Sequence, residues 1–217
     1  MFLVEGQKSV RELINSKFII ERIIHRSDRM PLGHEKEEEL NTREFDRIAN
    51  FKHSDGYLAV VRIPAQEELK RNDNILYLDS IADPGNLGTM VRTADWYGIT
   101  QVICSADTAD IYNPKTVSAT MGSLFHISVI YDDGSYLKNL SGSHTIIGSS
   151  LNGEDKAQIK SDKNTVLIIG SESHGMSEQT ESLCDQLVKI ERRGSAESLN
   201  AATACGILLD RILSINR

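Results

Sequence analysis

The sequence predicts an α/β protein whose main domain contains a mostly parallel sheet. Two observations support this prediction. Short apolar runs typical of buried strands alternate with helical patterns from about Asn74 onward, and most of these runs are bounded by Gly, Asp or Asn. The 217 residues also exceed a typical single domain of roughly 100–150 residues, which favours a second, smaller unit.

The predicted strands of the main domain cover residues 75–80, 101–105, 126–131, 145–149, 166–170 and 187–191. Helices are expected between and after them. One apolar stripe recurs at i, i+3, i+4 and i+7 after the first strand, which places a helix that begins near Asn86. Its members are Leu87, Met90, Val91 and Ala94. The last helix is expected over residues 197–214.

Residues 1–65 form the smaller α/β unit in this prediction. Its expected strands are 2–6, 18–25 and 57–63, and its expected helices are 9–16 and 42–49. Residues 35–39 are acidic, which is typical of a solvated surface run. The polar residues 66–73 are interpreted as a linker, so the main domain covers residues 74–217.

Composition and charge exclude several classes of protein. Hydrophobic residues make up 40% and charged residues 25% of the chain, as in ordinary soluble globular proteins. No apolar run approaches the roughly 20 residues of a membrane span, and the first residues lack the pattern of a signal peptide, so a cytoplasmic location is expected. The net charge of −7 argues against nonspecific coating of nucleic acid, but it is compatible with a local basic cleft.

The cysteines and histidines favour neither a disulfide nor a metal site. Cys104, Cys184 and Cys205 are widely spaced and odd in number, which is typical of buried free thiols. The six histidines show no ligand spacing. No bound metal is therefore expected.

The first segment with functional potential joins the first strand of the main domain to the helix that follows. Asp83-Pro84-Gly85 is strong turn chemistry, and Asn86 occupies the position of an N-cap. A well-formed turn with Arg92 on the solvent face would explain these residues without a function. However, open α/β sheets bind ligands at the carboxyl ends of their strands, and an arginine about two turns into the helix suits a phosphate.

A glycine-bracketed loop follows the predicted strand at 166–170. Gly170 and Gly175 permit backbone shapes and a close ligand approach that a side chain would block. The loop matches neither the dinucleotide fingerprint nor the phosphate loop, so a nucleotide phosphate is a poor candidate. A ligand with an adenine and few negative charges, held by backbone groups, fits better. A tight turn with a solvated Glu172 is the alternative without a function.

The third segment passes from the last strand through a Gly-Ser turn into the final helix. Ser198 and Asn200 are expected near the helix start, where free N–H groups and polar side chains can meet a ligand, although capping alone explains one of them. The helix itself carries unusually small side chains on its surface, which suits close packing against another element or another subunit. Its small residues are Ala201, Ala202, Ala204 and Gly206.

Together, the three segments resemble the motifs of the SpoU/TrmH family of RNA ribose methyltransferases, within the knotted SPOUT superfamily. The matching patterns are Asp83-Pro84-x-Asn86-x-Gly88 with Arg92, Gly170-x-Glu172-x-x-Gly175, and Ser198-Leu199-Asn200. Asn113-Pro114-Lys115 and residues 117–125 are also similar to the family. The resemblance covers residues from about 74 to 217. The N-terminal unit is similar to the ribosomal-protein-like RNA-binding domain of many relatives, here without its first helix.

The resemblance implies a C-terminal trefoil knot, S-adenosylmethionine as the cofactor and a homodimer formed through the knotted domain. The implied reaction is methylation of a ribose 2′-hydroxyl in a structured ribosomal or transfer RNA. The implied catalytic residues are Asn86, Arg92, Glu172, Ser198 and Asn200. The implied cofactor-binding residues are Gly170, Glu172, Gly175, Ile190, Ser198 and Leu199. The implied RNA-binding residues are Arg92, Lys115, Arg192 and Arg193.

The sequence departs from the family pattern in the third segment. Relatives commonly read Ile-Pro-Met before the glycine, whereas this chain reads Ile190-Glu191-Arg192-Arg193. The two additional arginines are interpreted as RNA contacts. Arg92 is interpreted as a phosphate clamp and not as the base, because a guanidinium is almost always protonated.

Three other classes of protein are alternatives. A catalytically inactive RNA-binding or ribosome-assembly protein would keep the fold, but the complete set of motif residues favours an enzyme. A tRNA base methyltransferase from a neighbouring knotted family would need a different set of site residues. The Ser198-Leu199-Asn200 motif instead favours a ribose as the methyl acceptor. A dehydrogenase would need the glycine fingerprint that this chain lacks.

Overall fold

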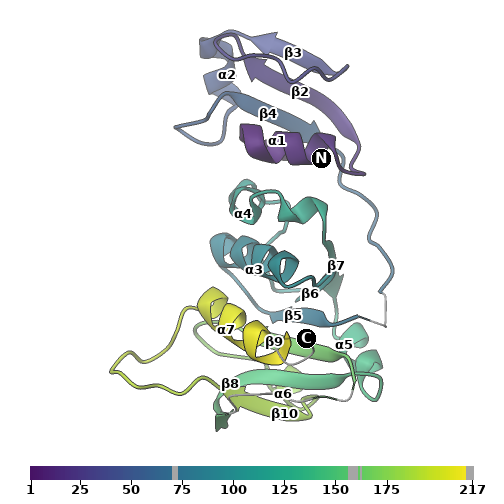
Figure 1. The fold of residues 1–217 in the computed structure, drawn as a ribbon, viewed down its shortest axis with the longest axis vertical. Helices are drawn as coiled ribbons and strands as arrows, with labels where there is room; N and C mark the ends of the chain where they lie inside the picture. The colour runs from purple at the N-terminus through teal and green to yellow at the C-terminus, as the bar shows by residue number, and fades with distance from the viewer. Residues whose placement is uncertain (70–72, 156–160, 162, 214–217) are drawn as a thin grey trace.

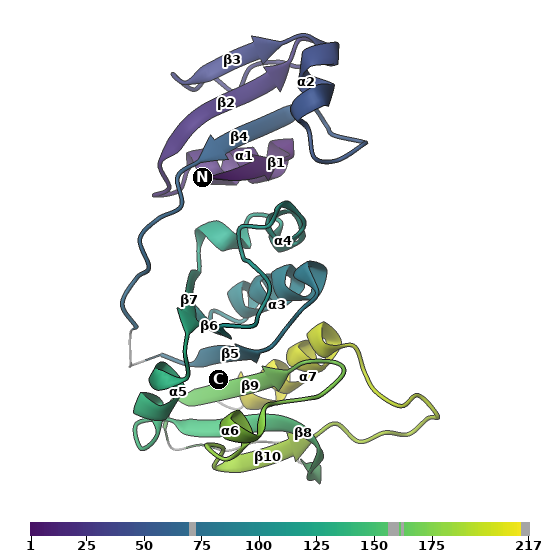
Figure 2. The same cartoon turned by 180° about the vertical axis from the view of Figure 1, so that it is seen from behind.

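The computed structural model describes residues 1–69, 73–155, 161 and 163–213. They form two α/β units that follow each other along the long axis of the molecule (Figures 1 and 2). The described residues between the units, 62–69 and 73, contain no helix or strand. Positions 70–72 of the predicted linker lie outside the described residues.

The N-terminal unit contains a four-stranded sheet in the order β1-β4-β2-β3. Its strands are β1 (Phe2–Glu5), β2 (Ile20–Arg26), β3 (Glu37–Leu40) and β4 (Tyr57–Val61), and its helices are α1 (Gln7–Ile14) and α2 (Thr42–Ile48). β4 is antiparallel to β1 and β2, whereas β3 is parallel to β2. The three predicted strands and both predicted helices are confirmed, with ends shifted by one or two residues.

Strand β3 corrects the prediction for residues 35–39, because part of this acidic run pairs with β2. The other glutamates of the run are exposed as expected, but the side chain of Glu37 is only 6% exposed. Its carboxylate accepts hydrogen bonds of 2.8, 2.8 and 3.3 Å from the backbone N–H groups of Leu32, Gly33 and His34. Burial opposes ionisation of Glu37, but these bonds outweigh it and lower the pKa of the carboxyl.

The described residues of the main domain form six parallel strands in the order β10-β8-β9-β5-β6-β7. In chain order these are β5 (Ile75–Asp79), β6 (Gln101–Ser105), β7 (Ser128–Asp132), β8 (Thr145–Asp155), β9 (Thr165–Gly170) and β10 (Gln186–Lys189). The predicted α/β fold with a mostly parallel sheet is confirmed. β8 is longer than predicted, and β7 begins later because a 3₁₀ helix, η1 (Ser123–Phe125), precedes it.

Helices cover both faces of this sheet. They are α3 (Pro84–Trp96), α4 (Pro114–Thr120), α5 (Ser135–Leu140), α6 (Glu178–Glu181) and α7 (Ala201–Leu213). Alternate residues of β5 face opposite ways, so Leu76 and Leu78 join the core beneath α3 and α7, whereas Ile75 and Tyr77 join the core beneath α5. The three cysteines are free as predicted, with Cys184 only partly buried. None of the described helices is long and apolar enough to cross a lipid bilayer.

The two units share one hydrophobic core. Val10 and Leu13 of α1 belong to the same buried cluster as Val117 of α4. Aromatic rings also cross the junction, where the ring centre of Phe2 lies 4.7 Å from that of Tyr112, and the ring centre of Phe18 lies 5.4 Å from that of Phe125. The N-terminal unit is therefore packed against the main domain, and the linker is not its sole attachment. Strands β5 and β9 are parallel neighbours in the main sheet, so the loops that follow them leave the sheet side by side.

Candidate active site

Helices α3 and α4 begin in the same way. Each has an aspartate or asparagine N-cap followed by a proline in the first turn. Asp83 accepts a hydrogen bond of 2.8 Å from the N–H of Asn86, and Asn113 accepts one of 2.9 Å from the N–H of Lys115. The prediction that Asn86 is the N-cap is wrong, because Asp83 fills that position. The side chain of Asn86 is consequently available for contacts outside its own helix.

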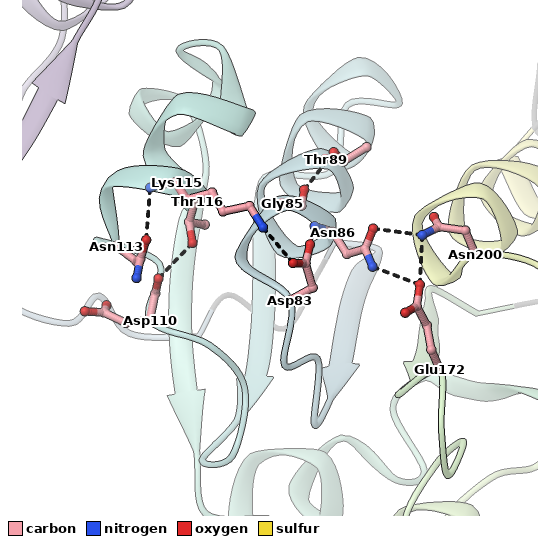
Figure 3. A network of polar contacts seen from close by, with 10 residues as sticks. All are labelled: Asp83, Gly85, Asn86, Thr89, Asp110, Asn113, Lys115, Thr116, Glu172 and Asn200. Carbon is pink, nitrogen blue, oxygen red and sulfur yellow. Dashed lines mark hydrogen bonds and ion pairs between the residues drawn. The ribbon is translucent and has the colours of Figure 1, made fainter. Parts of the chain in front are cut away.

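Lys115 ties the two helix starts together. Its ammonium lies 2.8 Å from the second carboxylate oxygen of Asp83 (Figure 3). This hydrogen bond, together with the N–H of Asn86, lowers the pKa of Asp83. The Lys115 side chain nevertheless remains 61% exposed. Asp83 is a residue whose role in the site the sequence analysis missed, although an aspartate directly before a proline at a helix start was a readable capping signal.

Gly88 allows α3 and α4 to pack closely behind this turn. A Cβ atom at Gly88 would lie 2.5 Å from the carbonyl oxygen of Thr116 and 2.6 Å from the Cβ of Ala119. No side chain fits these distances without a shift of backbone. The glycine of the first motif is therefore a packing requirement that fixes where Asn86 sits.

The loop after β9 closes on itself. Ser171 and Gly175 exchange two backbone hydrogen bonds of 2.9 Å, and Gly175 has a left-handed φ of 72°. A Cβ at Gly170 would lie 2.2 Å from the carbonyl carbon of Gly175, so glycine is required there. The closure places Glu172 on the exposed tip of the loop.

Glu172 is the centre of a polar network that joins the three motif segments (Figure 3). Its Oε1 accepts hydrogen bonds from the side-chain amides of Asn86, at 2.9 Å, and Asn200, at 2.8 Å. The Asn200 amide also donates to Oδ1 of Asn86 across 3.0 Å, and the N–H of Ala201 lies 3.3 Å from Glu172 Oε1. The structure thus brings together one predicted catalytic residue from each motif.

Asn200 has a second task at the start of α7. Its Oδ1 accepts hydrogen bonds of 3.0 and 3.2 Å from the N–H groups of Ala202 and Thr203. Of the two polar residues predicted near this helix start, Ser198 and Asn200, it is Asn200 that caps the helix. Helix α7 begins at Ala201 instead of the predicted residue 197. One side chain both caps the final helix and reaches the loop after β9.

The structure does not bring the remaining predicted residues into this network. Arg92 is exposed on α3 and has no polar partner among the described residues. Ser198 and Leu199 lie in the segment between β10 and α7, which extends away from the sheet (Figures 1 and 2). Arg192 is exposed in the same segment, and Arg193 lies 3.5 Å from the carboxylate of Glu191. Ile190 is partly buried against the main core.

The chemistry of the network is that of a carboxylate and amides without a nearby basic cluster. Residues 170–177 contain no lysine or arginine, and Oε2 of Glu172 has no hydrogen-bond partner among the described residues. The described part of the chain also contains no group of three His, Cys, Asp or Glu residues that could hold a metal ion. The network therefore suits a ligand that carries positive charge and hydrogen-bond donors.

The fold and the network define a parallel α/β domain with a cluster of hydrogen-bonded polar side chains at the carboxyl ends of its strands. Residues 73–210 match the model of the SpoU rRNA Methylase family, and the chain belongs to this family. This confirms the predicted resemblance.

Known relatives extend over nearly the whole chain. It is 33% identical over 215 residues to the 23S rRNA (guanosine(2553)-2′-O)-methyltransferase RlmP of Bacillus subtilis, covering 96% of this chain and 86% of RlmP. A TrmH-family structure from Porphyromonas gingivalis is 30% identical with a TM-score of 0.85, covering 97% of this chain and 88% of that one. An AdoMet-bound rRNA methyltransferase from Sinorhizobium meliloti is 26% identical with a TM-score of 0.84, covering 97% of this chain and 85% of that one.

Proposed function

We propose that this protein transfers a methyl group from S-adenosylmethionine to a ribose 2′-hydroxyl of a structured RNA, with ribosomal RNA as the first candidate. The observation that carries the proposal is the network of Asn86, Glu172 and Asn200, which joins all three family motifs within hydrogen-bonding distance. The B. subtilis relative is named as a 23S rRNA 2′-O-methyltransferase. The complete network also favours an active enzyme over an inactive RNA-binding protein.

The residues around the network fit S-adenosylmethionine. This cofactor is cationic at its sulfonium and amino groups, and the loop that carries Glu172 contains a carboxylate and no lysine or arginine. Leu199 is 47% exposed beside the cap residue Asn200 and offers an apolar surface to an adenine. We assign cofactor binding to Gly170, Glu172, Gly175, Ile190, Ser198 and Leu199, as the family resemblance implies.

S-adenosylmethionine, when bound, supplies a methyl group on a positively charged sulfur. The protein must then hold the ribose oxygen in line with that methyl group and accept or relay its proton. Glu172 keeps Oε2 open as an acceptor while Oε1 is held by the two asparagines. Arg92 is exposed and retains its planar fork for an RNA phosphate, which aligns the substrate without taking the proton. Ser198 completes the proposed catalytic set.

RNA contacts are assigned to Arg92, Lys115, Arg192 and Arg193. Three of these side chains are exposed without being committed to the network, and Lys115 stays 61% exposed although it pairs with Asp83. The N-terminal unit is assigned the role of a ribosomal-protein-like RNA-docking domain. Its shared core with the main domain holds it at a fixed position relative to the network.

The family resemblance also implies a trefoil knot, a homodimer and a cytoplasmic location, and we include these in the proposal. The knot is supported by the start of α7, which meets both the loop after β9 and the start of α3 through Asn200. The dimer is supported by the small and only partly buried Ala204 of α7, which would allow a second helix to approach closely.

Calorimetric titration with S-adenosylmethionine tests the cofactor assignment. The wild type is expected to bind saturably, and Leu199→Arg is expected to abolish binding because it places a bulky cation in the proposed adenine site. Leu151→Arg is the matched control, since Leu151 is 76% exposed on β8 and outside the proposed site. Absence of binding by the wild type, with and without RNA, would overturn the proposal in favour of a non-catalytic RNA-binding protein.

A further inference from the structure

Asp79 is a buried carboxylate that the proposed chemistry leaves without a role. It is the last residue of β5 and is only 3% exposed. Its Oδ2 accepts a hydrogen bond of 2.8 Å from the backbone N–H of Ser177, and its Oδ1 accepts one of 3.1 Å from the hydroxyl of Ser80. Burial of a carboxylate is costly unless donors compensate for it, and the Ser177 N–H and the Ser80 hydroxyl are the donors here.

Ser177 lies at the far end of the loop that carries Glu172. The loop begins at Gly170, which pairs with Asp79 itself where β5 and β9 lie side by side. Its near end is closed by the two backbone bonds between Ser171 and Gly175. Asp79 therefore holds the far end at the same sheet edge from which the loop departs.

The turn after β5 orients the Asp79 carboxylate. Ser80 has a left-handed φ of 59°, which is uncommon for a residue other than glycine. Its N–H donates to the Ser105 hydroxyl across 2.8 Å, and its own hydroxyl donates to Asp79. The Ser105 hydroxyl lies 3.2 Å from that of Thr108. A chain of hydroxyl groups thus fixes the backbone on which Asp79 is mounted.

We infer that Asp79 is a positioning residue that sets the loop from Gly170 to Ser177 and thereby the place of Glu172. The assignment rests on the proposed function insofar as the loop binds S-adenosylmethionine. Asp79 is buried behind the loop and acts through the Ser177 N–H. Loss of the Asp79 carboxylate is therefore expected to weaken cofactor binding and to make the Ser177 amide hydrogen exchange faster.

Asp132 provides a matched control. It is also 3% exposed and also ends a strand of the same sheet, β7. Its carboxylate accepts N–H hydrogen bonds from Tyr136 and Leu137, at 3.0 and 3.2 Å, at the start of α5. Asp132→Ala removes a comparable buried carboxylate without releasing the loop.

The experiment measures amide hydrogen exchange of Ser177 without cofactor, and the Kd for S-adenosylmethionine by calorimetry. Asp79→Ala is expected to accelerate exchange at Ser177 and to raise Kd about tenfold or more, because a charge-assisted hydrogen bond is lost. Asp79→Asn is expected to restore most of both, since its amide oxygen can still accept the Ser177 N–H. Asp132→Ala is expected to lower Tm but to leave exchange at Ser177 and Kd at wild-type values.

A second pair of variants removes the donor and leaves the buried acid in place. Ser177 has φ −65°, which proline adopts, so Ser177→Pro deletes the N–H, whereas Ser177→Ala deletes only the hydroxyl. Ser177→Pro should raise Kd as Asp79→Ala does, and Ser177→Ala should raise it less. Unchanged exchange and Kd in Asp79→Ala, or an equal rise in Kd in Asp132→Ala, would overturn the inference. If the wild type bound no S-adenosylmethionine, the proposed function would fail, while Ser177 exchange would still decide whether Asp79 holds the loop.

Discussion

Asn200 donates a hydrogen bond to Glu172 across 2.8 Å, which joins the cap of the final helix to the loop after β9. The same amide reaches Asn86 at the start of α3 across 3.0 Å. Because Asn200 also caps α7 through its Oδ1, formation of that helix and assembly of the network are coupled. Substitution of Glu172 or Asn200 is therefore expected to lower activity, although both residues are exposed.

Glu172→Gln is expected to lower turnover by about 10–100-fold, because the charge on the acceptor of three hydrogen bonds is lost and each charged bond contributes about 1.5–3 kcal/mol. The glutamine amide also places a donor where Oε2 now accepts. Initial rates of methyl transfer at saturating cofactor and RNA check this. Glu178→Gln, which neutralises an exposed carboxylate in α6, should leave the rate unchanged. Equal rates for wild type and Glu172→Gln would remove Glu172 from the site.

Arg92→Lys is expected to lose most of the turnover while keeping the affinity for S-adenosylmethionine and the Tm. Lysine preserves the charge but lacks the bidentate fork that a phosphate clamp requires. Steady-state kinetics with RNA and calorimetry with the cofactor check the two parts separately. Lys138→Arg exchanges the same two cations at an exposed position of α5 in the main domain and should have little effect. Retention of most of the turnover in Arg92→Lys would contradict the clamp.

Two glycines within helices are expected to respond to alanine with opposite sign. Gly88→Ala should lower the free energy of unfolding by about 1–3 kcal/mol, because the new Cβ would lie 2.5 Å from the carbonyl oxygen of Thr116. Gly206→Ala in α7 should raise it by up to about 1 kcal/mol, because the Cβ would lie 3.8 Å from Thr93, and alanine favours the helix. Thermal denaturation of both variants checks this. A Gly88→Ala variant as stable as the wild type would show that the α3–α4 contact is less tight than described, and a less stable Gly206→Ala variant would contradict the space at Gly206.

Cys184 is expected to be unreactive in the folded protein although it is only partly buried. Burial, with smaller effects of Glu181 and Asp185, raises the pKa of its thiol to about 12. At pH 8.5 the native thiol should therefore react with iodoacetamide on the order of a thousandfold more slowly than the thiol of the unfolded chain. Mass spectrometry of labelled peptides, with and without urea, checks this. Comparable labelling in both states would contradict the burial of the thiol.

The same shift predicts how stability depends on pH. The thiol of the unfolded chain ionises near its ordinary pKa of roughly 8.5, whereas the folded one ionises at about 12. The stabilising contribution of the neutral thiol is therefore complete below about pH 8.5 and is lost as the pH rises toward 12. Cys184→Ala should show a shallower fall of Tm between about pH 8 and 10 than the wild type.

The strands of the main domain were predictable because parallel strands buried on both faces produce apolar runs with clear ends. β3 was not, because its residues, Glu37–Leu40, carry no apolar pattern. It is a strand because it pairs with β2 and because backbone N–H groups hold the buried Glu37 carboxylate. Such tertiary contacts leave no periodic signal in the sequence.

The site was predictable as a set of motif residues but not as an arrangement. Asn86 and Glu172 lie 86 positions apart and meet because β5 and β9 are neighbours in the sheet, an order that local patterns do not encode. The N-cap was assigned to Asn86 because asparagine is a common cap, but Asp83 before Pro84 fills that position. The contact of Asp79 had no local signal at all, since its partner Ser177 is 98 positions away.

The most direct test of the central proposal is the position of a transferred methyl group. The purified protein would be incubated with labelled S-adenosylmethionine and unmodified 23S ribosomal RNA, with transfer RNA in parallel, and the RNA would then be hydrolysed with alkali. A 2′-O-methyl group prevents attack of that oxygen on the adjacent phosphate, so the label should appear in alkali-stable dinucleotides and form about 10–100-fold more slowly with Glu172→Gln. Label confined to mononucleotides, or no label in either RNA, would contradict ribose methylation by this protein.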